Sequence, residues 1–399
     1  MSHYVLVHGQ DYCLPPDPPT LPELLPPRFR KHHVGKWHLG HSRPGCLPTS
    51  RGYDDFQGYY LGGVDFYRHG SDEACCCGEV CGPGRSFGSF NGTFQDVHGL
   101  QVGEGEYITD AITRAAVSTI EGFEASPPPG GPASLFLTVA MAATHSGPSG
   151  DPQYKPSDVD PDLLLRSPKR AGFSAMAKNL DESVEAIHAA LEGRGMLEDT
   201  LIFLLSDNGG ETSSGSSVYP LRGEKFTYFN GGIMAPAAVL GKGVKGGGRS
   251  LRGNFWIGDV MPTVLEAVGA AVPGGLDGIS RSGAVFYGRF KLLVNGTAGY
   301  DEALGRPELA GWSPPADADD SEVRFGPVEE VMLFDVRDDE EERVNLAGLK
   351  GYAEVQRRCM EEFNAVLEST IPLERQTKQR GGSLDEITPG DTGYGPWQT

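Results

Sequence analysis

Hydrophobic and polar positions repeat with two different periods along the chain. Within 171–191 the apolar residues recur every three or four positions with charged residues between them, which predicts an amphipathic helix. The run Leu201–Leu205 is apolar throughout and has the length of a strand, so it predicts a buried strand, and 135–139 predicts another. Asp259 can cap a further helix over 261–268.

Strands that alternate with helices are typical of a mostly parallel sheet. The predicted fold class is therefore α/β, with helices covering both faces of the sheet. In such sheets the ligand site lies outside the carboxyl ends of the strands. His145 and Asp207 both follow predicted strands closely, so we expect them at that edge.

The pattern changes after Gly269. Short alternating runs at 284–287, 291–294 and Val331–Asp335 predict antiparallel strands, and a helix is predicted over 352–367. We interpret residues 1–280 as a large α/β domain, 281–374 as a smaller α+β domain with an antiparallel sheet, and 375–399 as an irregular tail.

Composition narrows the classes of partner. The net charge of −20 is spread along the chain, which argues against nucleic acid, because phosphate binding needs clustered Lys and Arg. The longest mostly apolar run, 133–143, is about half the roughly 20 residues of a membrane helix, so no membrane span is expected. The first residues show no basic leader followed by an apolar stretch, and we expect no signal peptide in these 399 residues.

Several polar residues could carry chemistry. Lys36 and His38 are two positions apart, so in an extended segment their side chains share a face and can reach one anion; the alternative is a surface turn around a packed Trp37. Asp207 and Asn208 offer a carboxylate and an amide oxygen, which suit a hard cation such as Ca²⁺, although these residue types also close strands as simple turns. Lys225 lies in a glycine-punctuated loop, where a solvated lysine is the alternative.

The order of these segments resembles the sulfatase family, and within it the branch of arylsulfatase B and its close paralogues. The similarity covers nearly the whole chain. The segments that carry it are Val34-Gly35-Lys36-Trp37-His38-Leu39-Gly40, Arg51-Gly52-Tyr53-Asp54, Thr144-His145, Ser206-Asp207-Asn208-Gly209-Gly210, Pro220-Leu221-Arg222-Gly223-Glu224-Lys225, Gly258-Asp259-Val260-Met261-Pro262-Thr263, Gly288-Arg289-Phe290-Lys291-Leu292-Leu293 and Leu333-Phe334-Asp335.

The resemblance implies an alkaline-phosphatase-like fold and the hydrolysis of sulfate esters of glycans or aryl compounds. It implies that Lys36 and His38 contact the sulfate and the nucleophile, and that His145 and Lys225 hold sulfate oxygens and assist the leaving group. Asp207 and Asn208 would bind Ca²⁺. Lysines, a donor histidine and a dication are the groups that stabilise the charge developed in sulfuryl transfer. A lysosomal or extracellular location is implied as well, which would suit the glycosylation tripeptides at Asn91 and Asn295.

The chain departs from the family pattern at its N-terminal end. The family's nucleophile is a formylglycine made from cysteine in a Cys-x-Pro-Ser-Arg segment, and an Asp-Asp pair after the first strand binds Ca²⁺. Tyr4-Val5-Leu6-Val7 is followed by His8-Gly9-Gln10-Asp11, which is not that pair. In Cys46-Leu47-Pro48-Thr49-Ser50-Arg51 the arginine is one residue too far, and its place after Lys36 matches a different family segment. We therefore expect an N-terminally truncated fold, an incomplete ligand set for the metal and no turnover by the chain as it stands.

Other functions remain open at this stage. A non-catalytic descendant could bind sulfated glycan through the same lysines and histidines. A phosphatase or phosphodiesterase of the wider superfamily would need clusters of Asp and His for two metals, which the sequence lacks. A secreted cysteine-rich module would rest on Cys75, Cys76, Cys77 and Cys81, and an odd total of seven cysteines leaves at least one unpaired within the chain.

Overall fold

The computed structural model describes residues 13–17, 19–41, 44–60, 62–69, 105–124, 134–244, 247–248, 250, 256–273, 283–294, 329 and 331–369. Several sequence features lie outside these residues, namely the segment 4–7, the cysteines from Cys75 to Cys81, the tripeptides at Asn91 and Asn295 and the tail 375–399. By its internal contacts the chain divides into two units, described separately below. One holds Val5–Leu201 and Gly241–Leu276, and the other holds Ile202–Leu240 and Asp277–Pro372. The domain limits at 280 and 374 stay a prediction.

The first unit is built on a parallel sheet. Strands β1 (Phe29–Lys36), β2 (Asp55–Tyr59) and β3 (Ser134–Ala140) lie in the order β2-β1-β3, and both pairs are parallel. In the central strand, β1, Gly35 has φ +102°, and a Cβ on this residue would lie 2.0 Å from the Ala140 carbonyl oxygen. The close approach of β1 to β3 near their carboxyl ends therefore requires glycine.

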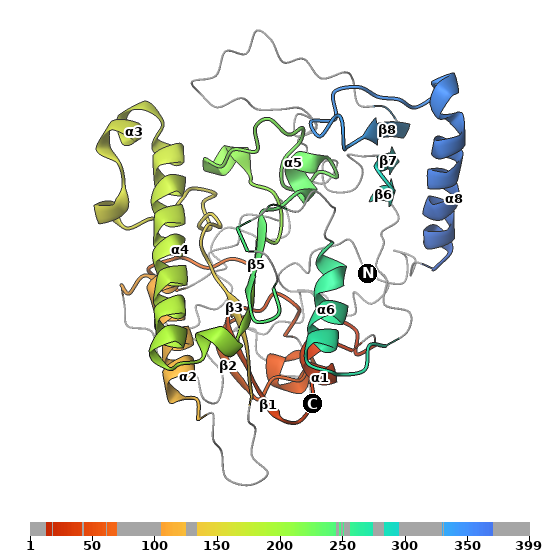
Figure 1. Cartoon of the computed structure of the whole chain (residues 1–399). Coiled ribbons are helices and arrows are strands. Elements are labelled where there is room, and N and C mark those ends of the chain that lie inside the picture. The colour runs from red at the N-terminus through yellow and green to blue at the C-terminus, as the bar shows by residue number, and fades with distance from the viewer. Residues whose placement is uncertain are drawn as a thin grey trace, which may run out of the picture. The chain divides into compact units, whose positions relative to one another are not determined.

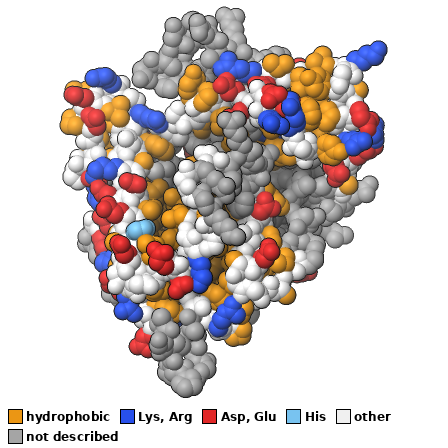
Figure 2. Space-filling view, in the orientation of Figure 1, with side chains coloured by type: hydrophobic (Ala, Val, Ile, Leu, Met, Phe, Trp, Pro, Cys, Tyr) orange, Lys and Arg blue, Asp and Glu red, His pale blue; other side chains and the backbone are white. Residues whose placement is uncertain are grey.

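Two long helices pack beside this sheet. α2 (Ile108–Gly122) and α4 (Pro168–Gly193) run next to one another (Figure 1), and α4 confirms the helix predicted over 171–191. Ile108, Ile112 and Met176 are buried in a common core with Val34 of β1. The outward face of α4 carries charges of both signs (Figure 2), including the pair Lys178 and Glu182 one turn apart. This unit also contains the helices α1 (Leu21–Leu24), α3 (Pro161–Arg166) and α6 (Val260–Ala267).

The N-terminus of α6 differs from its prediction in one detail. Asp259 is the N-cap residue, as predicted, but its side chain makes no capping hydrogen bond to α6. Its carboxylate accepts instead from the backbone N–H of Trp256, at 3.0 Å. Asp259 ends a short 3₁₀ turn, Ile257–Asp259, and this turn directs the carboxylate backwards along the chain.

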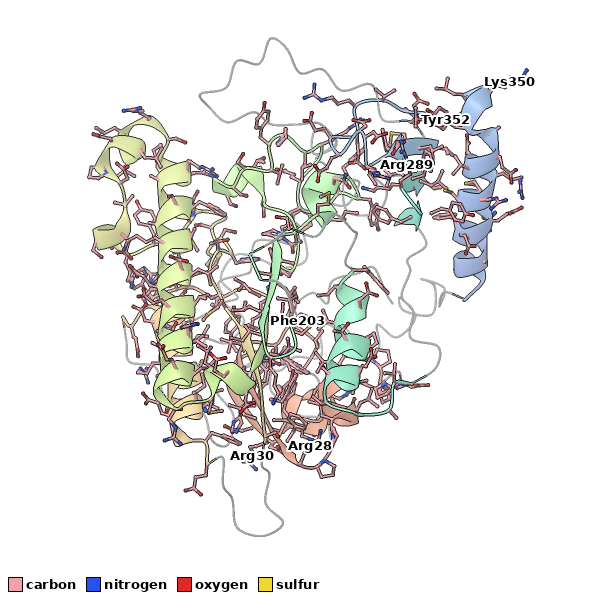
Figure 3. The ribbon with its side chains drawn as sticks, viewed as in Figure 1. Arg28, Arg30, Phe203, Arg289, Lys350 and Tyr352 are labelled. Atoms are coloured by element: carbon pink, nitrogen blue, oxygen red, sulfur yellow. A yellow bond between two sulfur atoms is a disulfide. The ribbon has the colours of Figure 1, made fainter. Side chains whose placement is uncertain are left out.

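The second unit contains the predicted antiparallel sheet. Strands β6 (Gly283–Tyr287), β7 (Phe290–Val294) and β8 (Val331–Asp335) pair in sequence order, and both pairs are antiparallel. Helix α8 (Ala353–Ser369) confirms the helix predicted over 352–367. Its Phe363 is buried with Leu292 and Leu333 of the sheet. The labelled Tyr352, just before α8, lies edge-on to Phe290 of β7, with ring centroids 6.0 Å apart (Figure 3).

The strand predicted over Leu201–Leu205 exists but is not buried. It is β4, which pairs with β5 (Ala237–Gly241) in a two-stranded sheet. Most of β4, including Phe203 (labelled in Figure 3), is half-buried, and Leu204 is 45% exposed. Every residue of β5 is exposed. The prediction of burial was wrong because, within the described residues, β4 pairs with one other strand. An apolar run predicts a strand, but it does not determine which residues will shield that strand from solvent.

No helix within the described residues has both the length and the hydropathy to cross a membrane.

Candidate functional site

Two of the predicted site residues follow neighbouring strands of the parallel sheet. Lys36 is the last residue of β1, and His145 lies five positions beyond the end of β3. β1 and β3 are parallel with Gly35 opposite Ala140, so both segments leave the sheet at the same edge. This is the edge at which the sequence placed the site.

The segment between Lys36 and His38 is not extended, so the condition under which the two side chains would share a face is not met. His38 has φ +52°, a left-handed conformation that ends the extended backbone. Its backbone N–H donates to the Tyr60 carbonyl at 3.1 Å. Trp37 is 6% exposed, and its Nε1–H donates to the carbonyls of Gly40 and Cys46 at 3.0 and 3.1 Å. The alternative of a turn around a packed tryptophan describes the local structure.

His33, which was not among the predicted site residues, is hydrogen-bonded to the backbone of Lys36. The Nε2–H of His33 donates to the Lys36 carbonyl at 2.8 Å. The ring is 5% exposed and lies against Trp37, Tyr53 and Phe56. Burial lowers the pKa of His33 to about 4, although the hydrogen bond to Lys36 acts in the opposite direction. His33 is therefore neutral near pH 7. His33 lies three residues before Lys36 in β1, but it belongs to no motif that would single it out in the sequence.

His145 has one ring nitrogen assigned by its contact. Its Nδ1 lies 2.8 Å from the Ser146 carbonyl oxygen, and because a carbonyl can only accept, Nδ1 carries a hydrogen. The backbone N–H of His145 donates to Ala142 at 2.9 Å, which fixes the turn after β3. Nε2 is thus the nitrogen that would accept a proton or, in the protonated ring, donate one.

The other three predicted residues lie in the second unit, where two loops are bonded to each other. The backbone N–H of Gly209 donates to Gly232 at 2.8 Å, and that of Lys225 donates to Gly210 at 3.0 Å. The Glu224 carboxylate, 2% exposed, accepts from the backbone N–H of Thr212 at 2.7 Å and from its hydroxyl. The structure therefore brings the loop of Asp207 and Asn208 together with the loop of Lys225.

Lys225 is half-buried between these loops. Its Nζ lies 3.9 Å from Glu211 Oε2 and 5.1 Å from the centre of the Phe226 ring. The ion-pair distance is at the limit for a direct contact. Such a cation can face an anion that enters beside it.

The donors for Ca²⁺ have the right chemistry but do not form a complete site. Asp207 is exposed, and the Asn208 side-chain amide donates to the Gly209 carbonyl at 2.8 Å. Ca²⁺ takes about six to eight oxygen ligands. The described residues contain no group of three or more His, Cys, Asp or Glu side chains suited to a metal ion. Calcium binding by Asp207 and Asn208 stays a prediction.

The segment that superficially resembles the nucleophile motif has a structural role. Cys46 is bonded to Cys13 in a disulfide, so its sulfur is not a thiol. Arg51 is 3% exposed and donates to Glu23 at 3.2 Å and to the Leu14 carbonyl at 2.8 Å. These contacts hold the segments before β1 and after it together. They support setting the segment aside as a source of the nucleophile.

Known proteins with a related sequence are sulfatases. The family described as Sulfatase matches residues 2–270. Arylsulfatase J of Mus musculus is 32% identical over 267 residues, which cover 67% of this chain and 41% of that protein. N-acetylgalactosamine-6-sulfatase of Canis lupus familiaris is 28% identical over 286 residues, which cover 69% and 50%. The chain thus spans half or less of the length of these two relatives.

Solved structures agree on the fold. Ps i-CgsB, in complex with k-i-k-neocarrahexaose, matches with a TM-score of 0.69 and 20% identity over 91% of this chain and 77% of that one. The sulfatase PsFucS1 from Pseudoalteromonas sp. matches with a TM-score of 0.57 and 19% identity over 92% and 74%. The alkaline-phosphatase-like fold class is confirmed. With the family matched over residues 2–270, this chain belongs to the sulfatase family.

Proposed function

We propose that this chain is the sulfate-holding part of a sulfuric ester hydrolase. The observation that carries the proposal is that the family match over residues 2–270 contains all six predicted site residues. They occur in the structure as two groups. Lys36, His38 and His145 follow β1 and β3, while Asp207, Asn208 and Lys225 lie on two loops that are bonded together.

Each group has a role that its chemistry supports. Lys36 and Lys225 would offset the charge of the sulfate, which the chain's net charge of −20 otherwise disfavours. His38 would contact the sulfate. His145, with its Nδ1–H engaged by Ser146, would present Nε2 to the leaving oxygen and donate a proton to it. Asp207 and Asn208 would give two of the oxygen ligands that Ca²⁺ requires.

We propose further that these 399 residues bind sulfate esters without hydrolysing them. The sequence has no Cys-x-Pro-Ser-Arg segment, and the nearest similar cysteine, Cys46, is in a disulfide. Without the formylglycine hydrate no atom of the described site would attack sulfur. A non-catalytic protein that binds sulfated glycan is the alternative, and it uses the same cations.

The names of the relatives suggest the class of ligand. One is an arylsulfatase and another acts, by its name, on N-acetylgalactosamine 6-sulfate. We propose a sulfated glycan or an aryl sulfate ester for this chain. The Cys13–Cys46 disulfide supports a lysosomal or extracellular location, because such bonds persist in oxidising compartments.

The test uses the chain secreted from mammalian cells behind an added signal peptide, with inorganic sulfate as the binding probe and 4-methylumbelliferyl sulfate as the substrate. We expect saturable sulfate binding, no fluorescence from turnover and no formylglycine in any cysteine peptide by mass spectrometry. Lys225→Gln should weaken sulfate binding about tenfold or more, since a charge-assisted contact is lost. Lys242→Gln is the matched control, because that lysine is 62% exposed and pairs with Asp199.

Each outcome bears on a different part of the proposal. Absence of sulfate binding by the wild-type chain would contradict the sulfate-holding role. Turnover of the substrate by the wild-type chain would contradict the expected inactivity and leave the sulfuric ester hydrolase as the function. Binding of sulfated glycan, with inorganic sulfate as competitor and without turnover, is the result that the non-catalytic alternative requires.

A further inference from the structure

A buried ion pair lies at the base of the loop that carries Lys225. Lys291 of β7 and Glu342, in the segment after β8, are both 0% exposed, and their Nζ and Oε1 atoms are 2.7 Å apart. Burial lowers the pKa of Lys291 and raises the pKa of Glu342, while each partner's charge opposes the shift of the other. Both side chains are fully buried, so neither charge is available to a ligand.

Both ends of the segment 222–230 are attached to Glu342. At one end the backbone N–H of Asn230 donates to Glu342 Oε2 at 2.6 Å. At the other end Arg222, 3% exposed, lies over the Phe229 ring at 4.3 Å and reaches the Glu342 carbonyl at 3.5 Å. Lys225 lies between these two attachments.

Lys291 acts on the same segment through Asn230. Its Nζ donates to Asn230 Oδ1 at 2.8 Å, and Asn230 Nδ2 donates to the Glu340 carbonyl at 2.7 Å. Asn230 is thus held through its backbone N–H, its side-chain oxygen and its side-chain nitrogen, and it is 1% exposed. A side chain with all of its polar atoms engaged in this way has one conformation.

The pair is difficult to explain by stability alone. Taking two charges out of water costs several kcal/mol each, and replacing a buried pair with apolar residues of similar size is often neutral or stabilising. This pair, however, bonds to Asn230 through both of its side chains, and the backbone carbonyl of Glu342 accepts from Arg222, so it can fix where the segment 222–230 lies. Glu224 and Lys225, in the middle of the loop, then bond to Thr212 and Gly210 on the loop of Asp207 and Asn208.

We propose that Lys291 and Glu342 are positioning residues that hold Lys225 in place through Asn230. The role of Lys225 in sulfate binding rests on the proposed function. The positioning of the segment 222–230 by Lys291 and Glu342 does not depend on that function. The antiparallel sheet would then help to position Lys225, because Lys291 belongs to β7 and Glu342 lies in the segment after β8.

Two double variants test this proposal, and they differ only in the side chain at position 342. Lys291→Met/Glu342→Gln removes both charges and keeps a side-chain oxygen that can accept from Asn230 N–H. Lys291→Met/Glu342→Leu removes that acceptor as well. Hydrogen exchange of peptides spanning 222–230, urea unfolding and binding of inorganic sulfate are measured for both variants and the wild type.

We expect both variants to unfold at urea midpoints close to that of the wild type. In the leucine variant the amides of 222–230 should exchange about tenfold faster and sulfate should bind about tenfold more weakly, as for one lost charge-assisted hydrogen bond. The glutamine variant keeps the acceptor for the Asn230 N–H and loses the hydrogen bond from Lys291, so it should fall between the wild type and the leucine variant in both measurements. Unchanged exchange in a stably folded leucine variant would overturn the proposal.

A failure of the proposed function gives a different pattern. If the wild type binds no sulfate but the leucine variant still loosens 222–230, the positioning role stands and the sulfate role fails. If the leucine variant does not fold, Asn230→Ala makes the same comparison, because it leaves the ion pair intact and removes the two side-chain hydrogen bonds of Asn230. Slow exchange over 222–230 in that variant would then overturn the proposal.

Discussion

At the scale of single residues, His33 shows how a buried group places a site residue. Its ring is enclosed by three aromatic side chains and donates to the Lys36 carbonyl. A neutral ring can do this in a dry environment, whereas a protonated ring would bring a charge into it. Neither the position nor the neutrality of His33 is visible in the sequence, because both depend on residues as distant as Tyr53 and Phe56.

This neutrality predicts a loss of stability in acid. The pKa of His33 falls from 6.5 to about 4 on folding, so the unfolded chain takes up the proton first. The contribution is fully present above pH 6.5 and is lost as the pH falls towards 4, by about 3 kcal/mol in total. Urea unfolding between pH 7 and pH 4.5 should show this slope in the wild type and a shallower slope in His33→Gln.

The exposed His188 gives the control, since His188→Gln should retain the wild-type slope. A His33→Gln variant with an unaltered slope would show that another group governs the acid dependence.

At the scale of elements, the segments on either side of β1 are tied together by a disulfide. Cys13 and Cys46 are 33 positions apart and are bonded, and Arg51 joins Glu23 and Leu14 beside them. The sequence could not identify this pair among seven cysteines, because spacing alone allows many pairings.

Removing the disulfide should destabilise the unit that contains β1. Closing a loop of 33 residues restricts the unfolded chain by about 3.7 kcal/mol, so Cys13→Ala/Cys46→Ala should lower the urea midpoint by a corresponding amount. The wild type in reductant should approach the double variant, and the double variant should not respond to reductant. A midpoint that reductant leaves unchanged in the wild type would contradict the bond.

Elements whose pattern is local were predicted well. The period of 171–191 gave α4, and the short alternating runs gave β6, β7 and β8, because helix and strand each impose their own spacing on apolar residues. The burial of β4 was not predictable, since exposure depends on neighbours in space. The spacing of Lys36 and His38 allowed either an extended segment or a turn around Trp37, and the structure has the turn, with His38 in a left-handed conformation and Trp37 hydrogen-bonded to Cys46. The site residues themselves were found by their resemblance to a family and not by their spacing.

At the scale of the whole molecule, each unit has a core of its own. Ile112 is 1% exposed in the core around α2 and α4, and Leu292 is fully buried between β8 and α8. Lys291 and Glu342, which are 51 positions apart, are paired by the fold, and their pairing could not be read from the sequence.

Matched cavities in the two cores should report on each unit separately. Ile112→Ala and Leu292→Ala should each cost about 2–5 kcal/mol. By hydrogen exchange, the first should speed exchange in α2 and α4 and the second in β7 and α8. Equal acceleration in both sets of peptides by either substitution would show that the chain unfolds as one cooperative body.

The division of the chain also has a consequence for its synthesis. The unit with the parallel sheet includes Gly241–Leu276, and α6 in this stretch contacts α1, while the Arg28 side chain donates to the Val268 carbonyl. The ribosome therefore makes Ile202–Leu240, which belongs to the other unit, before the first unit has all of its parts. When synthesis has reached about residue 240, the nascent chain holds two incomplete units. Apolar strands of both units are then open to a chaperone that recognises such strands.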